Sequence, residues 1–205
     1  RMDDLVEFSK VHNIQIGTIK DLIQHRLDSS NPVEFVSKSK IPTHYGEFTG
    51  HVYKDTIDNT EHIALTFGDY LDNEETMVRV HSECLTGDTL FSLKCDCGTQ
   101  LSNALGIISK NGSGVLLYMR GHEGRGIGLG NKIKAYSLQD EGDDTVDANL
   151  KLGFKNDQRD YGRGALILRS LGIEKMNLLT NTPSKRAGLE GYGLSITKRT
   201  SLLGK

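Results

Sequence analysis

The spacing of hydrophobic and polar positions changes along the chain, and these changes predict an order of secondary-structure elements. Between residues 3 and 27, apolar positions at helical spacing predict two short helical segments, with Thr18 as the N-cap of the second. Short alternating or β-branched runs predict strands at 48–53, 61–67, 77–81, 114–119, 176–180 and 194–198. Amphipathic runs predict helices at 101–110, 131–139 and 161–171, with Gly172 ending the last.

Strands dominate the first part of this pattern and then alternate with helices. We therefore expect an α/β fold in which helices pack on a mixed sheet. Residues 28–32 read as a turn or linker because they combine Asp, Ser, Asn and Pro. The pattern predicts a single α/β domain at about 41–205 that follows a short N-terminal helical extension at 1–40.

Composition excludes several classes of protein. Of the 205 residues 36% are hydrophobic and 25% are charged, which favours a globular chain over a disordered one. No run approaches the roughly 18 apolar residues of a membrane span, and no signal peptide opens the sequence. The net charge of −2 predicts no general affinity for nucleic acid. Residues 111–205 hold 15 basic and 10 acidic side chains, which suits an anionic ligand but is also compatible with chance.

Three cysteines lie within 14 residues, at Cys84, Cys95 and Cys97. Thiolates are strong zinc ligands, and three protein ligands leave the fourth tetrahedral position open, as in catalytic sites. His81 or His122 as fourth ligand would make the site structural instead, and three inert buried cysteines are the simplest alternative. An odd number of cysteines also argues for a reducing compartment, which we expect to be the cytoplasm, although an organelle-targeting segment upstream of Arg1 stays compatible with the sequence.

A glycine-rich segment follows the predicted strand at 114–119. Residues 120–132 hold five glycines together with Arg120, Arg125 and Lys132. Glycine lets backbone N–H groups approach phosphate oxygens, and the start of a helix favours anions. The segment is not a Walker loop, because the Gly-Lys-Ser/Thr ending is missing, and a surface turn is the alternative.

Two weaker patterns lie farther along the chain. The segment 156–161 contains Asp157 and Arg159, a weak pattern for which a surface capping cluster is the more frequent interpretation. The segment 180–186 follows a predicted strand at the end where α/β sheets bind ligands. There Thr180 and Lys185 are candidates to contact a purine or a phosphate, and an ordinary helix start is the alternative.

Together and in this order, these segments resemble GTP cyclohydrolase II. The resemblance covers roughly residues 41–205 and is carried by the stretches 79–88, 95–98, 121–129, 135–136, 138–140, 144–149 and 179–181. It implies that GTP is the substrate, that the imidazole ring is opened with release of C8 as formate, and that pyrophosphate is cut off. The implied product is 2,5-diamino-6-(5-phosphoribosylamino)pyrimidin-4-one, made in the first step of riboflavin synthesis.

The resemblance also implies roles for individual residues. Cys84, Cys95 and Cys97 match the ligands of one zinc ion per chain, which activates water for attack on C8, and Mg²⁺ accompanies the phosphates. Tyr136 matches a tyrosine tied to completing ring hydrolysis, Asp157 a proton acceptor and Arg159 a nucleophile toward the α-phosphate. The GTP-contacting positions match Arg79, Val80, His81, Ser82, Glu83, Gln100, Glu123, Gly124, Arg125, Thr145, Thr180 and Lys185.

One of these implied roles conflicts with elementary chemistry. An arginine is protonated in proteins, so we expect Arg159 to stabilise phosphoryl charge rather than attack phosphorus. The resemblance further implies a homodimer, and no role in binding membranes or nucleic acid.

The N-terminal segment has a resemblance of its own. Residues 2–9 and 17–23 are similar to the tail of 3,4-dihydroxy-2-butanone 4-phosphate synthase, which is often fused ahead of the cyclohydrolase. The chain is then expected to be part of a bifunctional protein, and an unrelated amphipathic extension is the alternative. Two rival functions remain: a related nucleotide hydrolase that stops after the first ring opening, and a non-catalytic zinc-bearing binding module.

Overall fold

The structure is a computed structural model, and it describes residues 2–19, 21–22, 25, 31–155, 157–181 and 189–202. Within these residues seven strands form one mixed sheet in the order β1-β2-β3-β5-β4-β6-β7. The strands are β1 (Val33–Thr43), β2 (Gly46–Asp55), β3 (Glu61–Phe67), β4 (Thr76–Ser82), β5 (Gly114–Met119), β6 (Lys175–Leu179) and β7 (Ser195–Thr200). Strands β1, β2, β3 and β5 pair antiparallel, whereas β5, β4, β6 and β7 pair parallel.

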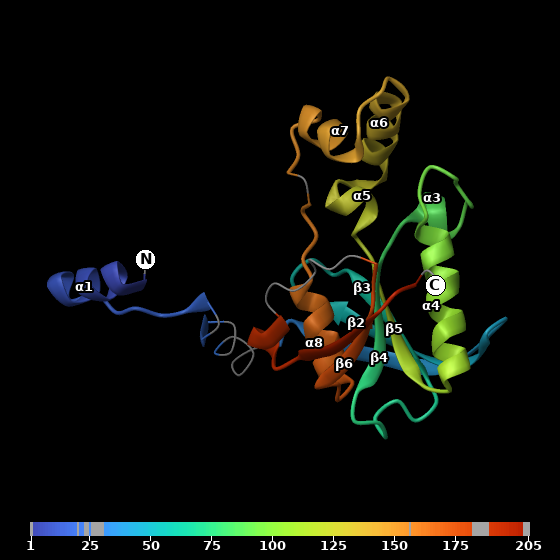
Figure 1. Cartoon of the computed structure of the whole chain (residues 1–205), viewed down its shortest axis with the longest axis horizontal. Coiled ribbons are helices and arrows are strands. Elements are labelled where there is room, and N and C mark those ends of the chain that lie inside the picture. The colour runs from blue at the N-terminus through green and yellow to red at the C-terminus, as the bar shows by residue number, and fades with distance from the viewer. Residues whose placement is uncertain are drawn as a thin grey trace.

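Helices α4 and α8 cover opposite faces of this sheet (Figure 1). The described helices are α1 (Met2–His12), α3 (Leu85–Asp88), α4 (Cys97–Asn111), α5 (Glu123–Gly126), α6 (Gly128–Asp140), α7 (Thr145–Lys151), α8 (Gly162–Ser170) and a 3-10 turn at Leu189–Tyr192. Helices α5, α6 and α7 form a separate group beyond the carboxyl ends of β4 and β5 (Figure 1). A parallel sheet core with helices on both sides brings these carboxyl ends to one edge, where such folds bind ligands.

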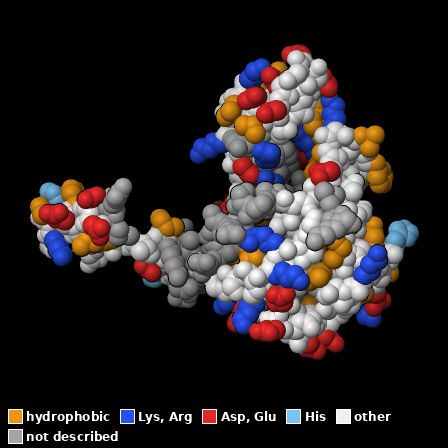
Figure 2. Space-filling view, in the orientation of Figure 1, with side chains coloured by type: hydrophobic (Ala, Val, Ile, Leu, Met, Phe, Trp, Pro, Cys, Tyr) orange, Lys and Arg blue, Asp and Glu red, His pale blue; other side chains and the backbone are white. Residues whose placement is uncertain are grey.

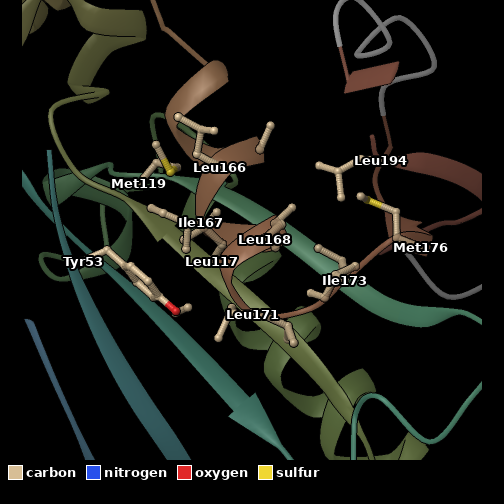
Figure 3. Packing of buried hydrophobic residues seen from close by; sticks show 14 of the residues in the cluster. Tyr53, Leu117, Met119, Leu166, Ile167, Leu168, Leu171, Ile173, Met176 and Leu194 are labelled. Carbon is tan, nitrogen blue, oxygen red and sulfur yellow. The ribbon is translucent and has the colours of Figure 1, made fainter. Parts of the chain in front are cut away.

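Alternate residues of β5 divide the core in two. Leu117 and Met119 pack against α8, where Ile167 and Leu168 are fully buried (Figure 3). Leu116 faces the other side, in the cluster that includes Ile108 of α4. Because successive side chains of a strand point to opposite faces, one central strand anchors both helical layers. The site described below therefore stands on the most deeply buried part of the sheet.

The α/β fold with a mixed sheet and packed helices is confirmed, and each predicted strand and helix from residue 48 onward has a counterpart. The left-handed φ of +81° at Gly172 agrees with its predicted place after α8. The prediction missed strand β1, the short helices α3, α5 and α7 and the 3-10 turn at Leu189–Tyr192. Asp144, the N-cap of α7, accepts hydrogen bonds from the backbone N–H groups of Val146 and Asp147. Strand β1 escaped prediction because it is an edge strand with mostly exposed, polar residues and a proline.

The N-terminal segment lies apart from the sheet in Figure 1. Helix α1 was predicted, and Leu5 and Phe8 of its apolar face are each 54% exposed. Hydrophobic, acidic and basic side chains are interspersed on the surface of this helix (Figure 2). Thr18 caps the next helical turn as predicted, with its hydroxyl accepting from the N–H of Asp21 at 3.0 Å. Among the described residues no helix is both long and apolar enough to cross a membrane.

Candidate functional site

A cavity of about 650 Å³ opens at the carboxyl ends of β4 and β5, between α3, α4 and the group α5–α7. The predicted site residues that line it are Arg79, His81, Ser82, Glu83, Cys84, Cys95, Cys97, Gln100, Gly124, Arg125, Tyr136, Thr145, Asp157 and Arg159. Val80, Glu123 and Thr180 do not line it, and Lys185 lies outside the described residues. Segments up to 80 residues apart in sequence thus meet around one space.

The three cysteines form one end of this cavity. Their Sγ atoms all lie within 4.8 Å of one another, and those of Cys84 and Cys95 are 3.6 Å apart. Two thiolates on a tetrahedral zinc ion sit about 3.8 Å apart, given a Zn–S distance of about 2.3 Å. The cluster therefore fits a zinc-sized ion, and among the described residues no histidine or carboxylate joins it.

Two glycines allow the cysteine-bearing segments to approach. A Cβ on Gly87 of α3 would come within 2.7 Å of the Sγ of Cys95 and 3.1 Å of that of Cys84. A Cβ on Gly98 of α4 would meet the carbonyl oxygen of Gly87 at 2.3 Å. Contacts this short are not tolerated, so both positions exclude any larger side chain. The spacing of the cysteines thus depends on close backbone contact between α3 and α4.

The thiols are electrostatically unequal. A hydrogen bond with Cys97 lowers the pKa of Cys84 to about 4, and the ammonium group of Lys132 acts in the same direction. The same interaction raises the pKa of Cys97, and burial raises that of Cys95. The group thus already holds one thiolate, the form that a metal ion needs.

Lys132 of α6 lies beside this thiolate and is buried. Its Nζ donates to the Sγ of Cys84 at 3.0 Å, to the hydroxyl of Thr86 at 2.7 Å and to the carboxylate of Glu123 at 2.5 Å. Burial disfavours the ammonium, but Cys84 and Glu123 outweigh burial and raise the pKa of Lys132. Lys132 therefore carries a positive charge beside the cysteine cluster.

Tyr136 is linked to the same network. Its hydroxyl lies 3.1 Å from that of Thr86, and its ring has the Nζ of Lys94 at 5.1 Å and that of Lys132 at 5.6 Å from the centroid. Lys132 and Tyr136 are four residues apart on α6, so they share a face of the helix. The phenol is therefore fixed beside the cysteine cluster and at the cavity wall.

His81 points away from the cysteines toward a different partner. Its Nε2 lies 3.0 Å from Oδ1 of Asp88, and its ring stacks on Tyr118 with centroids 5.5 Å apart. Asp88 also accepts hydrogen bonds from the backbone N–H of Cys84 at 3.0 Å and from the hydroxyl of Tyr118 at 2.7 Å. Asp88 thus fixes both the histidine and the first cysteine.

Arg79 provides a buried cation in the floor of the cavity. Its guanidinium donates to the carbonyl of Leu179 at 3.1 Å and to the side chain of Gln100 at 2.8 Å. Within the described part of the chain its Nε has no hydrogen-bond partner. A buried donor without a partner is costly in a native protein, so this atom favours an acceptor supplied by a ligand.

Asp157 and Arg159 also line the cavity, from the segment before α8, and form a two-point ion pair. The Arg159 Nε donates to Oδ1 of Asp157 at 2.8 Å, and Nη2 donates to Oδ2. Burial opposes the charges of both groups, but their attraction raises the pKa of Arg159 and lowers that of Asp157. Arg159 is accordingly a cation held in a fixed orientation.

Ser82 and His122 connect this ion pair to the glycine-rich loop. The Ser82 hydroxyl lies 3.1 Å from Nδ1 of His122 and accepts from Nη1 of Arg159 at 3.3 Å. Burial and the neighbouring positive charge of Arg159 lower the pKa of His122 to about 4. A backbone hydrogen bond with Asp160 acts the other way. His122 is therefore a neutral imidazole at pH 7.

The glycine-rich loop adopts unusual backbone angles. Gly124 and Arg125 both have positive φ, +59° and +65°, and the latter is rare for a residue with a side chain. The loop is tied on both sides, because the N–H of Gly121 donates to Glu83 at 2.7 Å and the carbonyl of Arg125 accepts from the N–H of Gln158 at 3.0 Å. Strain of this kind persists where the surroundings fix it and is common at ligand sites.

Several cavity residues were not among the predicted site residues. His122 and Lys132 had been noted only as an alternative ligand and a loop charge, whereas Lys94, Asp96, Gln139 and Asn149 were not singled out. Asn149 is 2% exposed, and its side-chain nitrogen has no partner within the described residues. Sequence analysis could have pointed to Asn149, because this residue lies in the stretch 144–149 that carries the family resemblance.

Comparisons with known proteins agree with the resemblance. The family model for GTP cyclohydrolase II matches residues 34–201. The chain is 52% identical over 202 residues to riboflavin biosynthesis protein RibBA of Salinispora tropica and 53% identical over 202 residues to that of Aquifex aeolicus. It is 51% identical to a rice protein called a probable monofunctional riboflavin biosynthesis protein, RIBA 3, chloroplastic.

These matches cover 98% of this chain but 50%, 50% and 38% of the three relatives. The chain therefore spans about half the length of the curated relatives it matches. A crystal structure of RibBX, a two-domain 3,4-dihydroxy-2-butanone 4-phosphate synthase from A. baumannii, is also similar. It shares 29% identity and a TM-score of 0.53, with 98% of this chain and 49% of that one covered. With the family model matching most of its length, the chain belongs to the GTP cyclohydrolase II family.

Proposed function

We propose that this chain hydrolyses GTP to 2,5-diamino-6-(5-phosphoribosylamino)pyrimidin-4-one, formate and pyrophosphate, the first step of riboflavin biosynthesis. One observation carries the proposal: a three-cysteine cluster and a fixed Asp–Arg pair line the same cavity of about 650 Å³. The reaction needs two separate hydrolytic centres, one at the purine ring and one at the α-phosphate. A cavity of this volume suits a nucleotide.

The cysteine end suits the ring chemistry. Cys84, Cys95 and Cys97 would hold one zinc ion and leave one coordination position free. Bound zinc would supply a Lewis acid and an activated water for opening the imidazole ring. Tyr136, fixed by Thr86, would orient the opened ring or donate a proton as the formyl group is removed.

The part of the cavity around Asp157 and Arg159, which we call the phosphate end, suits the phosphate chemistry. Arg125 and Arg159 line it, and the triphosphate with its Mg²⁺ would lie along these cations. Because Arg159 is held charged by Asp157, we assign it to stabilising charge on the α-phosphate rather than to nucleophilic attack. Asp157 would then orient Arg159, since both of its oxygens accept hydrogen bonds from that side chain.

The floor of the cavity suits recognition of the nucleotide. The unpaired donors Arg79 Nε and Asn149 Nδ2 would meet ring or phosphate oxygens of GTP. Gln100, Thr145 and the backbone of Gly124 line the same space and are proposed contacts. For Val80, Thr180 and Lys185 the proposed role rests on the resemblance, because the first two lie off the cavity wall.

We further propose that residues 1–40 continue a preceding 3,4-dihydroxy-2-butanone 4-phosphate synthase domain and that 41–205 form the cyclohydrolase domain. The partial coverage of the relatives supports this division. A homodimer and a cytoplasmic location are proposed from the resemblance and from the three free cysteines. Limited proteolysis and sedimentation of the full-length protein would test these points.

The deciding experiment is incubation with GTP and Mg²⁺, with formate, pyrophosphate and the chromatographed product measured in parallel. We expect both small products in equal amounts, and we expect formate release to stop after zinc chelation and to return on adding Zn²⁺. Pyrophosphate without formate would favour a hydrolase that stops early. Binding of GTP without either product would leave only a binding module.

A further inference from the structure

Glu123 and Lys132 form a buried ion pair directly behind the cysteine cluster. Each residue is 7% exposed, and the Lys132 Nζ lies 2.5 Å from the carboxylate of Glu123 and 3.0 Å from the Sγ of Cys84. Buried ions of this kind are retained only where their partners satisfy them fully. The question is which function the pair serves in a cavity that is otherwise lined by candidate nucleotide contacts.

All three donors of Lys132 are used inside the protein, and each oxygen of the Glu123 carboxylate accepts one hydrogen bond. An ammonium group has three donors, and Lys132 spends them on Cys84, Thr86 and Glu123. The second carboxylate oxygen of Glu123 accepts from the backbone N–H of Leu85 at 2.7 Å, and Glu123 does not line the cavity. Lys132 lines the cavity but keeps no free donor for a nucleotide, and the Glu123 carboxylate lies off the cavity wall.

We infer that Glu123 and Lys132 are positioning residues of the cysteine metal site and not contacts to GTP. This inference rests on the zinc site proposed above. Lys132 donates to the thiolate of Cys84, and Glu123 fixes both Lys132 and the N–H that follows Cys84 at the start of α3. The pair thus holds the first ligand from its sulfur side and from its backbone side.

The charge balance gives this arrangement a function. Three thiolates carry one negative charge more than a divalent zinc ion neutralises, and Lys132 offsets that excess at Cys84. An N–H donor to sulfur also withdraws electron density from the ligand, which leaves the bound metal a stronger Lewis acid. Glu123 in turn stabilises the buried ammonium beside Cys84, and zinc, the three thiolates and the ion pair together then carry one negative charge.

Zinc affinity, measured by competition with a chromogenic chelator, tests the inference. Lys132→Met should weaken zinc binding about 10- to 100-fold, the usual effect of losing a partner of a metal ligand. Because this variant buries Glu123 unpaired and could fail to fold, Lys132→Met/Glu123→Gln is the decisive variant. It removes the N–H···S contact without leaving a lone charge, and we expect the same loss. Lys134→Met is the matched control, since Lys134 lies exposed on the same helix.

Cobalt provides a readout that a purely structural role would not move. In the Co²⁺-loaded protein the sulfur-to-cobalt charge-transfer band should shift to lower energy in the double variant, because Cys84 becomes a stronger donor. The band should stay in place in Lys134→Met.

Affinity for GTP provides a separate test. The dissociation constant of an α,β-methylene GTP analogue for zinc-saturated Glu123→Gln should stay within about twofold of that of the unmodified protein. Loss of a contact of about 1.4 kcal/mol would raise it about tenfold.

Each outcome is decisive. A double variant with unchanged zinc affinity and an unchanged cobalt band would overturn the inference, as would a Glu123→Gln protein that loses the GTP analogue while keeping its zinc. If the unmodified protein itself binds no zinc, the proposed metal site fails, and the inference fails with it. The unmodified protein in the same assay distinguishes the two failures.

Discussion

The two ends of the cavity are built in different ways. At the cysteine end, backbone segments touch: Gly87 and Gly98 bring α3 and α4 together, and the partners of Cys84 are buried. At the phosphate end, side chains on loops are held by charge, as in the Asp157–Arg159 pair and the tie from Arg159 to Ser82. The contrast suggests that the cysteine end, which is the proposed metal end, depends most on the close backbone packing of α3 and α4. The proposed phosphate end depends on electrostatic attraction between side chains, so a mutation can disturb one end without the other.

The largest effect is expected where shape matters most. In Gly87→Ala the added methyl group would lie 2.7 Å from the Sγ of Cys95, so the sulfurs must separate. We expect zinc affinity to fall by about 100-fold or more and formate release to be lost at ordinary zinc concentrations. Gly130→Ala is the control, because a Cβ there meets nothing within 4 Å. Metal analysis after gel filtration measures the effect, and a Gly87→Ala protein with a full complement of zinc would remove the basis of the comparison.

At the phosphate end a conservative change should cost less. Arg159→Lys keeps a cation but loses the two-point contact with Asp157, so we expect pyrophosphate release to slow by about 10²-fold while zinc content is unchanged. Rapid-quench kinetics with α-labelled GTP measures the rate. The same quench, followed by mass spectrometry, gives the opposing test: a guanylylated Arg159 formed at a competent rate would make the arginine a nucleophile and would reverse our assignment.

Tyr136 sharpens the comparison because it joins the metal end without touching the phosphate end. Tyr136→Phe loses only the hydrogen bond to Thr86 and the phenolic proton. We expect formate release to fall by about tenfold, less than the roughly 10²-fold that is the lower end of an acid–base contribution, with pyrophosphate release unchanged. Chromatography should then reveal an accumulating N-formyl product. Equal losses of both products would instead place the tyrosine in nucleotide binding.

Some residues of the candidate site could be predicted from the sequence, and others could not. The cysteine spacing and the glycine loop are local patterns, so the residues that line the metal end and the loop could be named in advance. Asp88 could not be singled out, because its importance comes from His81, Tyr118 and Cys84 meeting it in space. Lys132 likewise reads as a phosphate-binding charge in a glycine-rich segment, and only its position on α6 turns it toward a thiolate.

The fold class was predicted correctly, but strand β1 was missed, because its place also depends on contacts in space rather than on a local pattern. Strands β2 to β6 bury one or both faces and therefore carry an apolar pattern, whereas β1 is specified mainly by its backbone pairing with β2. Backbone pairing leaves little trace in side-chain hydrophobicity. The described core and the edge strand β7 could thus be predicted from the sequence, and the edge strand β1 could not.

The smallest expected effect concerns His122, which ties the glycine-rich loop to the phosphate end. Its pKa of about 4 in the folded protein lies below the ordinary value of 6.5, so the unfolded chain binds a proton that the folded protein does not. The free energy of unfolding should therefore decrease as the pH falls from about 6.5 to 4, with His122 contributing up to about 1.4 kcal/mol per pH unit. In His122→Gln that contribution disappears, while the amide can still accept from Ser82 and donate to a carbonyl as neutral imidazole does. Urea unfolding of the metal-free proteins across this pH range gives the pH dependence of the unfolding free energy for each protein. His12→Gln, at an exposed position on α1, is the control.

Since the amide keeps the hydrogen bonds, pyrophosphate release in His122→Gln should stay within a few-fold of the unmodified protein. A loss of 10²-fold or more would mean that His122 transfers a proton in the reaction, and the phosphate end would then depend on acid–base chemistry as well as on charge.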